Sequence, residues 1–143
     1  MLTVNDLMTV RPCTVEPDML LRFVIRLMKE EGCRQLPVVE RGRLVGIVTE
    51  RDVRLALHAP FIKRWRRQDE DLLDRLTAAS CMTAEPITVT PDTSAWRAAQ
   101  MLSIYKFGAL PVLDGEVLVG IISVTDFLDY FAEGKAERAV FKV

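Results

Sequence analysis

The feature that most constrains the fold of this chain is an internal repeat. When the sequence is shifted so that Met8 falls on Met82, the two halves match in order and without a gap. Repetition at a fixed period marks a chain built from copies of one supersecondary unit, in which neighbouring copies complete a shared core. The shared segments are M-T-x-x-P-x-T-V-x-P-D, L-P-V and L-V-G-I, and the last runs into the related stretches GIVTERD, residues 46–52, and GIISVTD, residues 120–126.

Local signals predict the same order of elements in both copies. A Pro-Asp pair, at residues 17–18 and 91–92, predicts a turn and the N-cap of a helix, after which apolar residues recur at helical spacing. Two short apolar strands joined by a tight polar turn then predict a β-hairpin, and a second helix follows it. The remaining expected elements are short strands at 13–15 and 87–89, hairpin strands at 36–40, 44–49, 110–114 and 118–123, and second helices at 50–57 and 124–131.

The sequence therefore predicts an α/β fold made of two β-α-β-β-α repeats. One repeat buries too little apolar surface to be stable alone, so we expect the two to pack together about a pseudo-twofold axis. Hydrophobic residues make up 50% of the chain, which is enough for a real core. The expected domains are repeat 1 at 1–57, a charged helical spacer at 58–76, repeat 2 at 77–133 and a C-terminal tail at 134–143.

The chain carries almost no net charge, with 19 basic against 20 acidic residues. No long-range field therefore draws it to nucleic acid or to an anionic membrane. No apolar run reaches the roughly 18 residues of a membrane-spanning helix, and residues 1–10 lack a basic flank followed by an apolar core. We expect a cytoplasmic protein without a membrane partner.

The spacer belongs to neither repeat. Its basic cluster KRWRR, residues 63–67, has the composition of a nucleic-acid contact, but acidic residues follow at once and nearly cancel its charge, so we do not expect nucleic-acid binding. Its apolar residues fit an amphipathic helix that lies on the repeats or on a partner in a homodimer. These residues are Phe61, Ile62, Trp65, Leu72, Leu73 and Leu76. The tail, residues 134–143, is apolar enough to dock on a partner as well.

The sequence predicts neither catalysis nor a metal site. Its three cysteines lack C-x-x-C spacing, and its one histidine is His58. The chain has no G-x-x-x-x-G-K-[ST] phosphate loop and no G-x-S-x-G nucleophile motif. We therefore expect a protein that is not an enzyme and holds no covalent cofactor.

The ordered set of repeated motifs resembles a tandem pair of CBS domains, also called a Bateman module, of the stand-alone bacterial type. The resemblance implies a sensor. Such modules bind adenosine-bearing ligands, including AMP, ADP, ATP and S-adenosylmethionine, in two clefts between the paired domains. It also implies a homodimer and a regulated protein partner, which the sequence does not identify.

The ends of the two repeated stretches carry groups suited to a nucleotide. Thr49 and Ser123 lie where a strand gives way to a helix, and the backbone N–H groups and dipole at a helix start favour an anion such as phosphate. Asp52 and Asp126 follow three residues later, on the same face. A carboxylate there can accept hydrogen bonds from the two hydroxyls of a ribose.

The resemblance assigns each end to a cleft that the other repeat completes. Thr49 and Asp52 would share theirs with Thr83, Ile87, Phe107 and Gly108, and Ser123 and Asp126 would share theirs with Thr9, Cys13, Cys33 and Arg34. Arg51 and Arg54 stand beside the first motif, whereas Thr125 and Leu128 occupy these positions in the second. We therefore expect tighter binding of a phosphate-bearing ligand at Thr49 and Asp52.

A second interpretation of the same residues stays open. Thr-x-x-Asp and Ser-x-x-Asp at a helix start also match capping boxes, in which side chains satisfy backbone N–H groups. Duplication would copy caps as faithfully as binding sites, so repetition does not separate the two roles. On this interpretation the protein is an interaction scaffold with unoccupied clefts.

Overall fold

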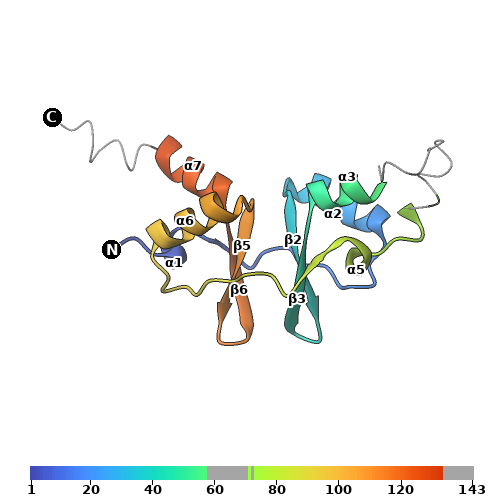
Figure 1. Cartoon of the computed structure of the whole chain (residues 1–143), viewed down its shortest axis with the longest axis horizontal. Coiled ribbons are helices and arrows are strands. Elements are labelled where there is room, and N and C mark those ends of the chain that lie inside the picture. Colours follow the sequence, from blue (N-terminus) through green and yellow to red (C-terminus); the bar gives the residue numbers. More distant parts are fainter. Residues whose placement is uncertain (58–70, 72, 134–143) are drawn as a thin grey trace. The chain divides into compact units, whose positions relative to one another are not determined.

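Both predicted hairpins are present in the structure, a computed structural model that describes residues 1–57, 71 and 73–133 (Figure 1). In the first, β2 (Gln35–Glu40) pairs antiparallel with β3 (Arg43–Thr49). In the second, β5 (Ala109–Asp114) pairs with β6 (Val117–Ser123). Arg41 and Gly42 join the first pair with φ of 51° and 78°, which is the pattern of a type I′ turn. That turn matches the twist of paired strands, so it sets the register of the hairpin.

Helices flank each hairpin in the predicted order. The first repeat has α2 (Leu21–Glu31) and α3 (Glu50–Leu57), and the second has α6 (Ala95–Tyr105) and α7 (Val124–Ala132). The predicted second helices agree with α3 at both ends and with α7 to one residue. The structure therefore confirms the α/β class and the order of elements within each repeat.

The predicted N-caps of α2 and α6 are wrong. The Pro-Asp pairs form the predicted turns but do not cap the helices, and the first turn is closed by the Met19 N–H, which donates to the Glu16 carbonyl at 3.1 Å. Proline fixes φ at the second position of a turn, which places the aspartate inside the turn. The helices begin after Leu20 and Ser94, and Ser94 Oγ accepts from the Arg97 N–H at 3.0 Å.

The first strand of each repeat is shorter than predicted. The stretches at 13–15 and 87–89 each contribute one parallel bridge, from Val15 to Val38 and from Val89 to Val112. Two further strands have no counterpart in the prediction. β1 (Thr9–Val10) pairs antiparallel with β6, and β4 (Thr83–Ala84) pairs antiparallel with β3.

These two short strands are exchanged between the repeats, so that each pairs with the hairpin of the other repeat. Each follows a one-turn helix, α1 (Val4–Leu7) or α5 (Ala78–Cys81), and extends the hairpin of the other repeat, so the sheets run β1-β6-β5 and β2-β3-β4. The chain accordingly divides into two units. Unit 2 is Cys13–Pro86, and unit 1 joins Met1–Pro12 to the chain from Ile87 onward. The predicted domain boundaries at 57 and 77 mark the ends of the sequence repeats, which are not the same as the two compact units, and they stay predictions.

Glycines in the repeated stretches make room for the exchanged strands. A Cβ on Gly46 would lie 2.9 Å from the Thr83 carbonyl oxygen, and one on Gly120 would lie 2.8 Å from the Thr9 carbonyl oxygen. Such distances are shorter than real Cβ contacts, so a side chain would push the strand away. Because the Gly that opens each repeated stretch has no side chain, β4 or β1 can lie close against the hairpin.

Each unit has its own core. In unit 2, apolar side chains of α2 and α3 pack with those of β2 and β3. In unit 1, α6 packs with β5 and β6 in the same way (Figure 1). The fully buried side chains include Leu21, Leu36, Leu110 and Ile122. Because side chains of β3, α3 and β6 take part in these cores, packing fixes the strand-to-helix junctions that follow β3 and β6.

The described end of the spacer packs within unit 2, against the first repeat. Leu73 and Leu76 contact its core, and Arg22 Nε forms an ion pair with Asp74 at 2.7 Å. The amphipathic helix predicted for the rest of the spacer, including Leu72, and the tail at 134–143 lie outside the described residues.

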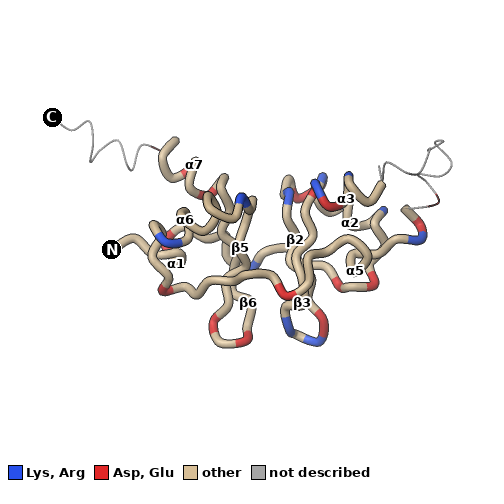
Figure 2. Tube along the Cα trace, viewed as in Figure 1, with Lys and Arg blue, Asp and Glu red and all other residues tan. Residues whose placement is uncertain are grey.

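Acidic and basic positions are interspersed over the described trace in both units (Figure 2). Of the helices within residues 1–57, 71 and 73–133, none combines the length and apolar character needed to cross a bilayer.

Candidate functional site

The two repeated stretches form matching corners, each where a strand passes directly into a helix. The first corner runs from Thr49 to Asp52. The Asp52 N–H donates to Thr49 Oγ1 at 3.0 Å, and the Thr49 N–H donates to Asp52 Oδ2 at 2.9 Å. This is a reciprocal capping box, in which each side chain satisfies a backbone donor of the other residue. The predicted capping box is therefore present at the first corner, and its presence does not decide between a cap alone and a cap that also binds a ligand.

The second corner, Ser123 to Asp126, repeats the box. The Ser123 N–H donates to Asp126 Oδ2 at 2.8 Å, and the Asp126 N–H donates to Ser123 Oγ at 3.2 Å. One contact has no equivalent at the first corner: the Thr9 hydroxyl, on β1, donates to Asp126 Oδ1 in a long hydrogen bond of 3.3 Å. Among the described residues, no group donates to Asp52 Oδ1. The two carboxylates therefore differ in what they can still accept.

Backbone donors at the helix starts are partly used as well. The Glu50 N–H, first in α3, donates to the Arg34 carbonyl at 2.8 Å, and the third N–H is held by the capping box. At the second corner the Val124 N–H donates to the Gly108 carbonyl at 3.0 Å. Among the donors of the first turn, the second N–H of each helix, that of Arg51 or Thr125, has no acceptor in the described part of the chain and is left to a phosphate. The anion site predicted at each helix start therefore has fewer free backbone N–H donors than an uncapped helix end would have.

The predicted site residues divide between the units. Unit 2 holds the first corner with Thr83, Cys13, Cys33, Arg34 and Arg51, and unit 1 holds the second corner with Thr9, Ile87, Phe107 and Gly108. Within unit 2, Thr83 pairs with Ile47 on β3, two residues before the first corner begins. Within unit 1, Thr9 contacts the second corner directly. The grouping of Phe107 and Gly108 with Thr49, and of Cys33 and Arg34 with Ser123, stays a prediction.

Charge separates the two corners, as the sequence indicates. Arg51 and Arg54 on α3 are exposed, and their counterparts Thr125 and Leu128 carry no charge. Arg34 Nε also lies 3.9 Å from Glu50 Oε2. Sequence reasoning missed Glu50, whose counterpart Val124 is apolar, although this difference between the repeats was the available signal.

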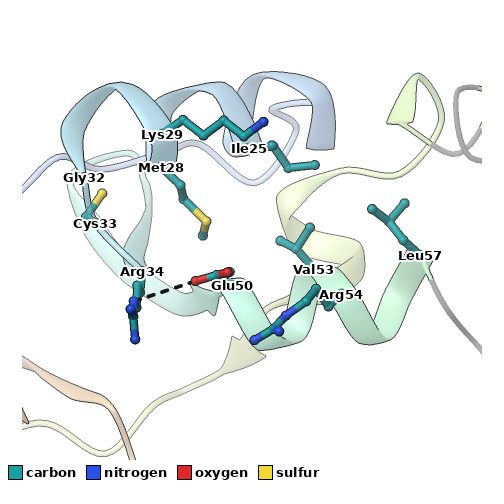
Figure 3. Close-up of a pocket in the computed structure, with 10 residues that line it drawn as sticks. All are labelled: Ile25, Met28, Lys29, Gly32, Cys33, Arg34, Glu50, Val53, Arg54 and Leu57. Carbon is teal, nitrogen blue, oxygen red and sulfur yellow. Dashed lines mark ion pairs between the residues drawn. The ribbon is translucent and has the colours of Figure 1, made fainter.

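A groove of about 430 Å³ lies between α2 and α3 in unit 2, beside the first corner (Figure 3). Its lining includes Cys33 and Arg34, two of the predicted site residues, together with Glu50 and Arg54. Figure 3 shows Met28 reaching into it from α2 and Val53 from α3. No feature of the sequence alone pointed to this groove.

The cysteines of unit 2 are protonated thiols at neutral pH. Burial raises the pKa of Cys81, and the nearby Asp52 carboxylate raises it further. Burial also raises the pKa of Cys33, and burial together with the Glu31 carboxylate raises that of Cys13. Because the thiolate is the reactive and metal-binding form, none of these environments activates a cysteine.

Comparison with known proteins places this geometry in context. The family profile of the CBS domain matches residues 4–59 and 78–133. A Vibrio cholerae protein assigned to acetoin utilization (AcuB) is similar in structure, with 28% identity, a TM-score of 0.79 and coverage of 97% of this chain and 96% of that one.

Two similar structures contain adenosine-bearing ligands. Arabidopsis thaliana CBSX2, in complex with AMP, has 28% identity and a TM-score of 0.76 over 94% of this chain and 99% of that one. The CBS domain pair of protein MJ0100, in complex with 5′-methylthioadenosine and S-adenosyl-L-methionine, has 26% identity and a TM-score of 0.76 over 92% and 96%.

Proposed function

This chain belongs to the CBS domain family, with two such domains in tandem, and on that premise we propose that it is a regulatory module that binds an adenosine-bearing ligand. Structurally similar CBS pairs carry AMP in one case and 5′-methylthioadenosine with S-adenosyl-L-methionine in another. The shared part of these ligands is adenosine, with its ribose hydroxyls. Sensing such a ligand requires binding and no catalysis.

One observation on this chain carries the proposal. Asp52 Oδ2 is held by the Thr49 N–H, while Oδ1 accepts no hydrogen bond within the described part of the chain. The box therefore orients the carboxylate and leaves acceptor capacity for ribose hydroxyls. The Thr49 hydroxyl accepts from the Asp52 N–H and still has its own proton to donate to a phosphate oxygen.

We expect the first corner to bind more tightly than the second. Arg51 and Arg54 supply positive charge there, and a ribose at Asp126 competes with the Thr9 hydroxyl for Oδ1. The remaining residues of each site follow the family resemblance, in which both repeats contribute. Among the candidate ligands AMP, ADP, ATP and S-adenosylmethionine, the phosphate-bearing ones fit the arginines of the first corner best.

Regulation follows if the ligand prefers one conformation of the module. A ligand shifts a conformational equilibrium only by its difference in affinity for the two states. We expect a homodimer that transmits this shift to a regulated protein. Light scattering on the purified chain, with and without ligand, tests the dimer directly.

Thermal melts with AMP, ADP, ATP, S-adenosylmethionine and NADH test the proposed ligand class. At about one hundred times Kd, binding stabilises the folded state by about 2.7 kcal/mol. For a chain of this length that raises Tm by roughly 5–10 °C. GMP, which keeps ribose and phosphate but changes the base, is the control for adenine.

The interaction-scaffold alternative predicts a different result. It expects no shift with any of the five ligands at millimolar concentration, and no adenine compound released when the purified protein is denatured and its small molecules are weighed by mass spectrometry. A Tm shift with an adenosine ligand and not with GMP excludes it.

A further inference from the structure

The groove between α2 and α3 is lined by two chemically different sets of side chains. Its floor is aliphatic, built from Ile25 and Met28 of α2 and from Val53 and Leu57 of α3. Its rim carries Lys29, Arg34 and Arg54, with Glu50 as its acidic member. In Figure 3 the floor side chains of the two helices face one another and the charged groups lie around them. We propose that this α2–α3 groove binds an amphiphilic anion, of the class of medium-chain carboxylates, as a second ligand beside the nucleotide, although Cys33, Arg34 and Arg54 are also among the residues expected to contact the nucleotide.

The floor selects an aliphatic tail over a nucleobase. Adenine requires hydrogen-bonding groups at its edge, but the floor residues lie on helices whose interior backbone groups are already paired. Met28 and Val53 are only 8% and 4% exposed, so their side chains form a firm apolar base. A volume of about 430 Å³ is within the size range of small-ligand sites and suits a short chain.

The rim selects an anionic headgroup. Arg34 is paired with Glu50 at 3.9 Å, so the acid offsets one cation. Lys29 and Arg54 have no acidic partner among the described residues, and Figure 2 shows basic positions on both helices. Lys29 and Arg54 lie on opposite sides of the groove (Figure 3), so a carboxylate headgroup can meet a cation on either side while its tail leaves water.

The second repeat carries different side chains at the positions that line the groove in the first. At the aligned positions unit 1 carries bulkier apolar residues, Phe127 for Val53 and Phe107 for Cys33. The rim cations are replaced as well, with Ser103 for Lys29 and Leu128 for Arg54. The phenylalanines would narrow the groove and the rim changes remove two of its cations, whereas Ala99 in place of Ile25 and Lys106 in place of Gly32 act in the opposite direction.

Titration calorimetry with decanoate below its micelle concentration tests the groove on the full chain. We expect saturable binding, with decanol at least about ten-fold weaker because it lacks the charge. Lys29→Ser should weaken decanoate about two- to five-fold, and Lys29→Arg should keep it. Arg26→Ala removes an exposed cation of α2 that does not line the groove and should change nothing. Val53→Phe, which copies the second repeat, should abolish binding.

A local measurement keeps the test decisive if Val53→Phe folds poorly. Cys33 lines the groove and Cys81 does not, so decanoate should slow alkylation of Cys33 by iodoacetamide and leave Cys81 unchanged. Equal binding of decanol, or unchanged binding in Lys29→Ser, would overturn the anion site. No binding of decanoate to a chain that light scattering shows to be a dimer would assign the groove to a second copy, and competition by AMP would assign it to the nucleotide site.

Discussion

Thr49 and Asp52 each satisfy a backbone donor of the other, through hydrogen bonds of 3.0 and 2.9 Å. The Asp52 side chain can therefore cap the helix and also accept hydrogen bonds from a ligand, so the two interpretations of the repeated motif are compatible. The cap uses one carboxylate oxygen and fixes its direction, which leaves the other oxygen oriented before a ligand arrives. An acceptor held in place in this way loses less entropy on binding.

Asp52→Ala should lower the free energy of unfolding by about 1 kcal/mol, because α3 loses its reciprocal cap. Asp52→Asn should cost less, since its amide oxygen still accepts from the Thr49 N–H. Urea denaturation measures both. Asp6, which accepts from the Thr3 N–H at 2.8 Å in the box of α1, provides the matched pair Asp6→Ala and Asp6→Asn. Equal losses from the alanine and asparagine variants of Asp52 would show that the cap is not what stabilises this corner.

Gly46→Ala should destabilise the protein by about 1–3 kcal/mol, the usual range for overpacking. The new Cβ would lie 2.5 Å from Met82 Sδ and 2.9 Å from the Thr83 carbonyl oxygen, so β4 has to shift. Val117→Thr, at the exposed position of β6 that aligns with Arg43, is the control. A Gly46→Ala variant as stable as the wild type would mean that β4 does not lie against β3 in solution.

The sequence predicts the hairpins and α3 well because their signals are local. Apolar runs, turn residues and helical spacing all lie within about ten residues of one another in each case. The N-caps of α2 and α6 were wrong because a Pro-Asp pair serves equally well in a turn before the helix. Only the exact hydrogen bond, such as that from the Met19 N–H to the Glu16 carbonyl, separates the two.

The exchanged strands and the groove could not be predicted from the sequence for a different reason. β1 and β4 are two residues long, so they carry no periodic signal, and their partners are distant along the chain. The groove depends on the sizes of side chains from both α2 and α3.

Acid should weaken the attachment of the spacer end to the first repeat. The hydrogen bond from Arg22 lowers the pKa of Asp74 from its usual value of 3.8. A carboxyl whose folded pKa is depressed stabilises the fold above its unfolded pKa, and this contribution is lost as pH falls through the folded value. The difference in Tm between wild type and Asp74→Asn should therefore be present at about pH 6 and vanish towards about pH 2. A difference that persists in acid would rule out the ion pair as its source.

The reactivity of the Cys81 thiol should depend on the charge of Asp52 at the first corner. Because the Asp52 carboxylate adds to the effect of burial on its pKa, Asp52→Asn should lower that pKa and raise the rate of alkylation at neutral pH. Peptide mass spectrometry after a timed iodoacetamide pulse measures the rate, and Cys13 in the same sample is the internal control. An equal rise at both cysteines would indicate general loosening of unit 2 in place of a local charge effect.

Titration calorimetry with AMP tests the central claim, that the two aspartates of the repeated motif bind an adenosine ligand and that the first corner binds it more tightly. The variants are Asp52→Asn and Asp126→Asn, with Asp6→Asn as the capping control. We expect wild type and Asp6→Asn to bind alike, Asp52→Asn to bind at least about ten-fold more weakly through loss of a charged acceptor, and Asp126→Asn to show a smaller loss. Wild-type affinity in Asp52→Asn, or a loss in Asp126→Asn alone, would contradict the account.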